Sequence, residues 1–190
     1  MLRRHFFLAF AVAHSVWLSG CAPPAPSKIT VNQMQLQQDL QARFPQQYPI
    51  AGLMRLDLRQ PQLQLLPASN QLQTTLDVSL SGPTLRKDLQ GHMHVRFGLV
   101  YQPQDDSVQA QRVEVLALQL EGASPALSNM LQTYGLRVAQ QALQGFSLHT
   151  VSAKDLKQVQ RMGLQLGAVT VTAQGFDVAV QAPQAQAAHL

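Results

Sequence analysis

The sequence predicts an α+β fold, in which a long helix packs in a highly curved antiparallel β-sheet and a shorter helix precedes the strands. The first observation is the alternation of apolar and polar residues in several segments between Leu56 and Leu120, which is typical of antiparallel strands with one face covered and one in water. The second is a pair of segments, one near Leu36 and one near Leu131, whose apolar residues recur every three or four positions, as in amphipathic helices.

Residues 1–20 have the pattern of a bacterial signal peptide. Arg3 and Arg4 form a basic start, and an apolar stretch of 13 residues follows from Phe6 to Leu18. A membrane-spanning helix needs about 20 apolar residues, so this stretch is too short to be one and fits the hydrophobic part of a signal peptide.

A single cysteine stands directly after this stretch. Leu18-Ser19-Gly20-Cys21 resembles the lipobox of bacterial lipoproteins, which predicts signal cleavage between Gly20 and Cys21 and attachment of diacylglycerol and a further acyl chain, such as palmitate, to Cys21. The alternative is an ordinary signal peptide with a chance cysteine. Several acyl chains anchor a protein stably to a membrane. The residue after the cysteine is Ala22 rather than an aspartate, which resembles lipoproteins that are sorted to the outer membrane, and we expect the protein to face the periplasm. Residues 21–28 would form the lipidated cysteine and a proline-rich tether.

The composition limits the partners, binding sites and number of domains that the protein can have. The net charge of +4 falls to +2 without Arg3 and Arg4, because 12 of the 14 basic residues then face 10 acidic ones, and this argues against a nucleic-acid partner. Charged residues are 13% of the chain, but its 29 glutamines supply polar surface. One cysteine excludes a disulfide framework and a Cys-rich metal site. We expect a single domain over residues 29–182 and a frayed tail over 183–190.

The first predicted helix begins after a capping-box pattern. Thr30-Val31-Asn32-Gln33 offers a Thr hydroxyl to one free backbone N–H and a Gln three residues later. Leu36, Leu40 and Phe44 then form a narrow apolar stripe on a helix of about 12–15 residues. Two prolines, at 45 and 49, are expected to end it.

Four segments with strand periodicity follow. The alternation slips at Gln60-Pro61, which predicts a bulge. The segment 72–80 alternates cleanly up to a turn at Gly82-Pro83, and the segment 89–101 alternates over 13 positions, with two glycines that suit a bent sheet. After a hairpin loop at Pro103–Ser107, a last strand slips its alternation near Leu116.

The long helix is predicted to begin at Ser124-Pro125, with Ser124 as N-cap and Pro125 in the first turn. It runs for about 20 residues to Gly145 and is the obvious cover for the sheet. Its expected buried stripe is Leu127, Leu131, Tyr134, Val138 and Ala142. The rest of the chain predicts a strand at 146–151, a short basic helix at 152–161 and one or two strands between 164 and 180.

Residue patterns that carry chemistry are sparse. His92-Met93-His94 places two imidazoles on one strand face, but two solvated histidines are the favoured interpretation because no third ligand is evident. Asp105-Asp106 is interpreted as a loop pair that bonds its own backbone rather than as an acid/base pair. The cations of the basic helix, Lys154, Lys157 and Arg161, are interpreted as a solvated face, with contact to anionic headgroups as the alternative.

No nucleophile elbow, phosphate loop or dinucleotide fingerprint occurs in the sequence. We therefore predict no enzyme, no catalytic residue, no metal and no cofactor.

Taken together, these patterns resemble the YceB-like bacterial lipoproteins, a family catalogued as a domain of unknown function. The resemblance rests on the lipobox, on Ile29-Thr30-Val31-Asn32-Gln33, on the 72–82 strand, on Met130-Leu131-Gln132-Thr133 and on Gly163-Leu164-Gln165-Leu166 before a closing strand. It implies a long helix held in a curved sheet, similar to the half-barrel of the tubular lipid-binding (TULIP) superfamily, whose members carry lipids between helix and sheet. It implies no catalytic residues.

Two functions stay open from the sequence. The first is binding of a lipid or other apolar ligand in a groove between helix and sheet, with the membrane reached through the N-terminal lipid anchor. The second is a non-catalytic envelope scaffold with a closed core and a protein partner that the sequence does not identify. The expected groove lining is Leu76, Val78, Met93, Val95, Phe97, Leu131, Tyr134 and Val138.

Overall fold

The strands form two antiparallel sheets in the computed structural model, which describes residues 28–50 and 53–183. The larger sheet has the order β2-β3-β4-β5-β6-β7 and the smaller one the order β1-β9-β8. The six strands of the larger sheet are β2 (Gln46–Ile50), β3 (Met54–Leu66), β4 (Gln71–Ser81), β5 (Leu89–Gln102), β6 (Ser107–Leu120) and β7 (Ser147–Thr150). The smaller sheet contains β1 (Lys28–Asn32), β8 (Gln165–Thr172) and β9 (Gly175–Gln181).

A continuous helix of 19 residues covers the larger sheet. It consists of α2 (Pro125–Met130), the π-helical turn η2 (Leu131–Gly135) and α3 (Leu136–Leu143). The Ser124 hydroxyl accepts from the N–H of Leu127, and Pro125 occupies the first turn, as predicted. The shorter helices are α1 (Gln33–Ala42), α4 (Ala153–Arg161) and the 3-10 turn η1 (Pro67–Ser69).

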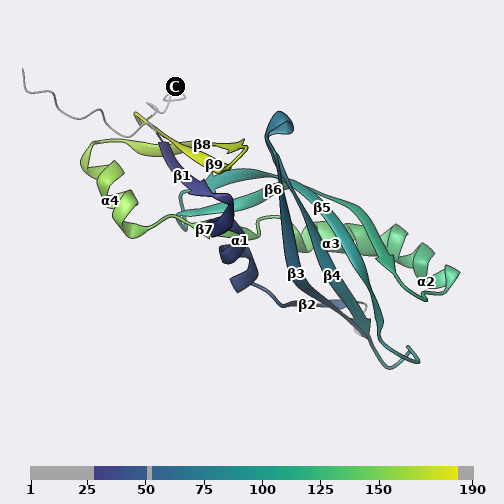
Figure 1. Ribbon diagram of the computed structural model, residues 1–190. Coiled ribbons are helices and arrows are strands. Elements are labelled where there is room, and N and C mark those ends of the chain that lie inside the picture. The colour runs from purple at the N-terminus through teal and green to yellow at the C-terminus, as the bar shows by residue number, and fades with distance from the viewer. Residues whose placement is uncertain (1–27, 51–52, 184–190) are drawn as a thin grey trace, which may run out of the picture.

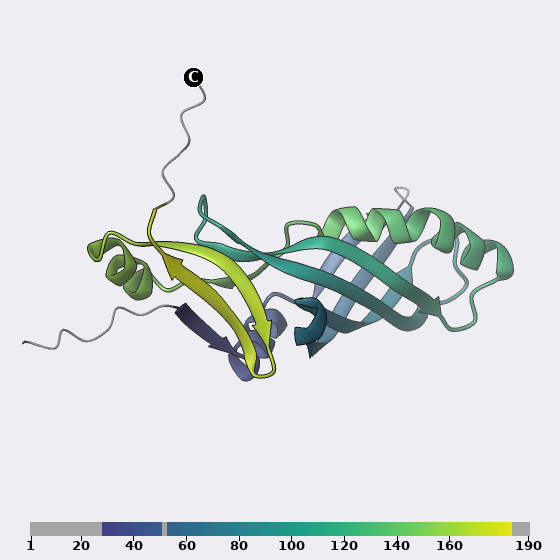
Figure 2. The same ribbon diagram turned by 90° about the horizontal axis from the view of Figure 1, so that it is seen from above.

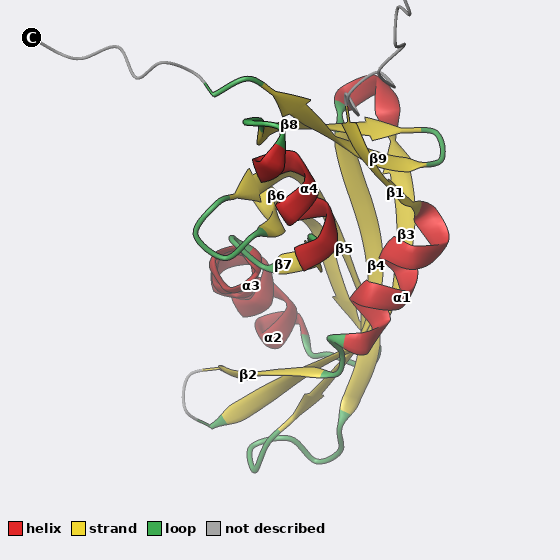
Figure 3. Cartoon of the chain, turned by 90° about the vertical axis from the view of Figure 1, so that its left-hand side faces the viewer, coloured by secondary structure: helices red, strands yellow, loops and turns green. Residues whose placement is uncertain are grey.

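The larger sheet curls strongly into a half-barrel, and the fold is α+β as predicted. Figure 3 shows the long helix in the opening of the half-barrel, between the edges that β2 and β7 form. Figures 1 and 2 show that β1, β8, β9 and α4 gather at one end of the molecule, away from α2. None of the described helices is long and apolar enough to cross a bilayer.

Bulges and close backbone approach allow this curl, and two of the bulges lie where the alternation slips. The β3–β4 register shifts between Arg59 and Gln62, and Gln60 has a φ of 48°. The β5–β6 register shifts at Leu116, which the ladder leaves unpaired. A Cβ on Gly91 would lie 1.8 Å from the carbonyl oxygen of Gln119, so only glycine lets β5 and β6 approach this closely.

Two strands, β1 and β2, were not predicted. Both lie where the sequence was expected to begin or end the first helix. Thr30, expected as a helix cap, lies in β1, and the helix begins three residues later with Asn32 as its N-cap, whose Oδ1 accepts from the N–H of Gln35 at 2.8 Å. The capping-box prediction was therefore wrong in position, because β1 pairs with β9 from the far end of the chain. The prolines expected only as helix terminators flank and enter β2, where Pro49 is tolerated because β2 is an edge strand.

The predicted strands at 146–151 and 164–180 and the basic helix are confirmed as β7, β8, β9 and α4. The predicted signal sequence, Cys21 and the predicted tether lie outside the described residues, except for Lys28, which lies in β1; so does all but the first residue of the predicted tail.

Candidate functional site

The concave face of the half-barrel holds most of the predicted groove-lining residues. Leu76 and Val78 on β4, and Met93, Val95 and Phe97 on β5, are all at most 5% exposed. The strict alternation along both strands places them on one face, and the long helix and α1 cover that face. The strand part of the predicted lining is therefore apolar and buried.

The helix part of the predicted lining is partly wrong. Leu131 is buried, at 2% exposed, but Tyr134 and Val138 are 66% and 44% exposed and lie on the outer surface. The buried residues that follow Leu131 are Gly135, Ala139 and Leu143.

The π-helical turn explains this one-residue offset. The N–H of Leu136 donates to the carbonyl of Leu131, five residues back, and the Thr133 hydroxyl donates to the carbonyl of Asn129 at 2.8 Å. The wider π-helical turn holds one more residue, so the buried stripe of the helix continues from Leu131 at Gly135 (i+4) instead of at Tyr134 (i+3). A signal for this was present in the sequence, because Gly135 and Ala139 are small residues aligned between Leu131 and Leu143, and small residues permit close packing of a helix.

The space between helix and sheet is nearly filled. The apolar cavity there measures about 20 Å³, enough for about one water molecule and far below the roughly 300 Å³ or more of a typical ligand site. The residues around it come from α1 and the segment after it, from strands β4 to β7, and from the end of the long helix and the segment after it: Leu40, Phe44, Thr74, Leu76, Val95, Phe97, Ala110, Val113, Leu143, Phe146 and Leu148. Around this cavity, at the end of the long helix, the interior is a closed core.

Larger clefts lie outside the half-barrel. One of about 500 Å³ lies between the end of α1 and the bulge of β3, where Phe44, Arg59 and Pro61 line it. Another of about 460 Å³ lies between the end of β5 and β8, with Leu99 and Val169 on opposite sides. Neither brings together an acid, a base and a nucleophile among its lining residues, so neither has the arrangement of an active site.

The two histidines of the predicted metal-like pair lie on the outer face of β5. His92 Nδ1 lies 3.1 Å from Asp77 Oδ1, and His94 Nδ1 lies 3.0 Å from Thr75 Oγ1, so each imidazole bonds to a neighbour on β4. No group of three metal-ligating side chains occurs among residues 28–50 and 53–183. The favoured interpretation, two surface histidines, agrees with this geometry.

The Asp105-Asp106 pair lies in the hairpin turn, as expected, but its carboxylates accept from side chains of the flanking strands rather than from their own backbone. Asp105 accepts from the Ser107 hydroxyl at 2.8 Å and from the Gln109 side chain at 2.9 Å, and Asp106 accepts from the Tyr101 hydroxyl at 2.8 Å. Burial raises the pKa of Tyr101, and the hydrogen bond to Asp106 raises it further. The tyrosine therefore stays protonated and donates to the carboxylate at neutral pH.

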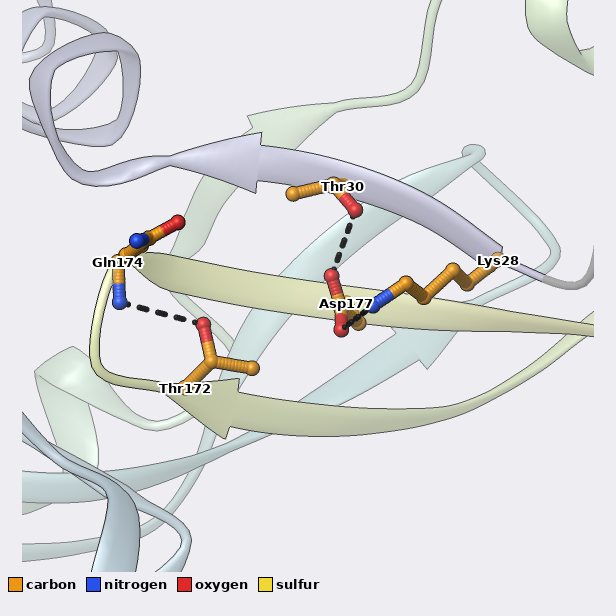
Figure 4. Close-up of polar contacts among 5 residues, drawn as sticks. All are labelled: Lys28, Thr30, Thr172, Gln174 and Asp177. Carbon is orange, nitrogen blue, oxygen red and sulfur yellow. Dashed lines mark hydrogen bonds and ion pairs between the residues drawn. The ribbon is translucent and has the colours of Figure 1, made fainter.

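A second set of polar contacts ties the smaller sheet together. Asp177 on β9 accepts from the Lys28 ammonium and from the Thr30 hydroxyl, both on β1 and both at 2.7 Å (Figure 4). The Lys28 ammonium holds the pKa of Asp177 below its usual value, with the Thr30 hydroxyl acting in the same direction. On the tight β8–β9 turn, the N–H of Gln174 donates to the Thr172 hydroxyl.

A hydrogen-bonded pair, the buried His149 and the half-buried Asp39, lies at the junction of the two sheets and was missed from the sequence. His149 on β7 is 8% exposed, and its Nδ1 lies 2.5 Å from Asp39 Oδ2 on α1. The imidazole also meets the Phe176 ring edge-on, with 6.0 Å between ring centroids. The partners are 110 residues apart in sequence, so no local pattern could have joined them.

Comparison with known proteins assigns no family to the chain. The chain matches no protein-family model and no curated protein.

Proposed function

We propose that the protein is an outer-membrane lipoprotein of the YceB-like type that faces the periplasm and binds a lipid or other apolar ligand between the long helix and the half-barrel. The observation that carries the proposal is the unequal burial of the two layers. The concave strand residues are almost completely buried, whereas α2 contributes no buried residue and the remainder of the long helix contributes only Leu131, Gly135, Ala139 and Leu143.

Because the interior is closed, a ligand must displace the long helix to enter. Full burial of Leu131 and Leu143 is worth about 3–6 kcal/mol together, and the partly buried Leu127, Met130 and Leu136 add roughly half as much per residue. Displacing the helix thus costs about 5–10 kcal/mol in lost apolar contacts. An acyl chain of about 14 methylenes gains roughly 11 kcal/mol on burial at ~0.8 kcal/mol per methylene. A lipid with two chains that enters from water therefore offsets the cost of opening.

The test uses the mature chain with Cys21→Ser, which removes the only cysteine. Two adjacent helix positions, Ala139→Cys and Val138→Cys, then report separately on the inner and outer faces. We expect the thiol at 139 to react with a soluble maleimide far more slowly than the thiol at 138. Addition of a diacyl phospholipid should change the rate at 139 only, and native mass spectrometry should show the lipid mass. No uptake under conditions that load a known lipid carrier would contradict the proposal.

The second candidate is a non-catalytic envelope scaffold, and the nearly filled interior favours it. A scaffold with a permanently closed core would show no lipid mass, and its labelling rate at position 139 would not change with added lipid. Crosslinking in cells would instead recover a protein partner on the outer surface.

The lipid anchor is tested separately, in cells. We expect the full chain to carry diacylglycerol and acyl groups on its first mature residue, seen by mass spectrometry of the N-terminal peptide, and to fractionate with the outer membrane. The Cys21→Ser variant should lose both. An unmodified Cys21 would contradict the lipid anchor and would indicate an ordinary secreted protein.

A further inference from the structure

The outer face of α4 concentrates positive charge. Lys154, Lys157 and Arg161 are all exposed, and their spacing of three and four residues places them on one face of the helix. The opposite face carries the buried Val159 and the partly buried Leu156, which pack onto the core. The three cations therefore point into solvent, away from the body of the molecule.

Acidic side chains near α4 are engaged in contacts of their own. Asp155 accepts from the Ser152 hydroxyl at 2.7 Å, at the N-terminus of the helix. Asp106 accepts from Tyr101, and Asp177 pairs with Lys28 on the smaller sheet. Asp105 accepts from Ser107 and Gln109 within the β5–β6 hairpin. None of the three α4 cations forms an ion pair among the described residues.

The position of α4 relative to β1 brings this face toward the start of the mature chain. A cleft of about 270 Å³ is lined by Lys28 and Ile29 from β1 and by Gln158 and Val159 from α4, so the two elements are neighbours. Figure 1 shows both at the same end of the molecule. Lys28 follows Cys21 by seven residues, and a chain of that length spans at most about 25 Å.

We propose that the α4 face, defined as Lys154, Lys157 and Arg161, binds the anionic headgroups of phospholipids and holds this end of the molecule against the membrane. The argument from chain length rests on the proposed lipid anchor, whereas the argument from charge does not. Each Lys or Arg near an anionic surface contributes about a fourfold to tenfold gain in partitioning, so three give roughly a hundredfold gain. Such an attraction weakens steeply with salt.

The experiment measures binding of the mature chain with Cys21→Ser to vesicles of phosphatidylcholine with and without about one third phosphatidylglycerol, at low and at physiological ionic strength. We expect partitioning onto the anionic vesicles only, strongest at low salt. The variant Lys154→Gln/Lys157→Gln/Arg161→Gln should lose about a hundredfold in partitioning.

A matched control removes three other exposed cations, with Arg86→Gln/Lys87→Gln/Arg137→Gln. Arg86 and Lys87 lie between β4 and β5, and Arg137 lies in α3. Figure 1 shows the β4–β5 turn and α3 away from α4. The control should keep its partitioning within about threefold, and the thermal unfolding of both variants should match that of the parent chain.

Equal losses in both triple variants would overturn the proposal, because net charge alone would then explain the binding. Absence of binding to anionic vesicles at low salt would also overturn it and would leave an acidic protein as the occupant of the α4 face. Neither readout needs acylation of Cys21 or a ligand under the long helix. Failure here is therefore distinguishable from failure of the proposed function.

Discussion

The two sheets of this protein are held by different means. The half-barrel relies on an apolar interior, in which Leu72, Leu76, Met93 and Val95 are at most 1% exposed. The smaller sheet also has an apolar centre in Phe176, but its strands come from both ends of the chain and are joined by specific polar contacts, including Asp177 to Lys28 and Thr30.

This difference indicates which region can move. Strands β2 to β6 of the half-barrel are neighbours in sequence, so short hairpins form their ladders with little loop-closure cost, and only β7 joins after the long helix. The smaller sheet must close a loop from β1 to β9 of almost the whole domain, and its polar contacts specify that closure. The long helix is held less firmly than either sheet, because it buries few side chains and forms no strand pairing. We therefore expect the helix to be the element that opens.

The largest effect is expected at the junction between the sheets. Phe176→Ala removes a fully buried ring that packs against His149, and should lower the free energy of unfolding by about 3–5 kcal/mol. Urea unfolding followed by circular dichroism measures this. Val180→Ala on the same strand, which is only partly buried, should cost much less. Equal costs would show that Phe176 is not the centre of the smaller sheet.

The next prediction separates the two faces of the long helix. Leu131→Ala should lower the free energy of unfolding by about 2–4 kcal/mol, because it leaves a cavity against the sheet. Tyr134→Ala should change it by less than about 0.5 kcal/mol, because the ring is mostly in water. The reverse ranking would mean that the helix follows the regular α-helical stripe rather than the π-helical one.

The His149–Asp39 pair, in which only the histidine is buried, is expected to contribute less. A double-mutant cycle with His149→Ala and Asp39→Ala should give a coupling free energy of about 1.5–3 kcal/mol, the range for hydrogen bonds to charged groups. His92→Ala and Asp77→Ala form the matched surface cycle, since both of those side chains are largely exposed, and should give less than about 1 kcal/mol. Equal coupling free energies in the two cycles would contradict a special role for the His149–Asp39 pair.

Asn70 provides a smaller link between the sheets. Its side chain donates to the carbonyl of Val169 at 3.2 Å and accepts from the N–H of Val171 at 2.6 Å, while its backbone has a φ of 53°. Asn70→Gly keeps that backbone conformation favourable and removes both bonds, so unfolding free energy should fall by about 1–2 kcal/mol. Protection of the Val171 amide against hydrogen exchange should fall too, and unchanged protection would contradict the link.

The smallest expected effect is pH-dependent. Because Lys28 lowers the pKa of Asp177, the carboxylate stabilises the fold above the unfolded-state pKa of about 3.9, and that contribution is lost as pH falls through the lower folded-state value. Asp177→Asn should therefore cost less than about 1 kcal/mol at neutral pH, and the difference from the parent should shrink below about pH 4. Unfolding measured across this range checks the sign, and a difference that grows in acid would refute it.

Local sequence patterns were sufficient for most of the strands and for the long helix. Alternation placed β3 through β6 and the bulges near Gln60 and Leu116, since a strand covered on one face repeats every two residues and a bulge shifts that repeat by one. A second β5–β6 register shift, between Arg96 and Gly98, was not predicted. Ser124 and Pro125 placed the start of the long helix because capping is a local interaction. The burial of Leu76, Val78, Met93, Val95 and Phe97 followed from the same alternation.

Tertiary structure alone decided the features that depend on distant partners. Thr30 has a valid capping pattern, but pairing with β9 draws it into a strand. Tyr134 and Val138 fit a regular helical stripe, but the π-helical turn rotates them outward and brings Gly135 and Ala139 against the sheet. Local patterns record the period of an element and its end signals, whereas the choice of face and partner is set by packing against residues far away in the chain.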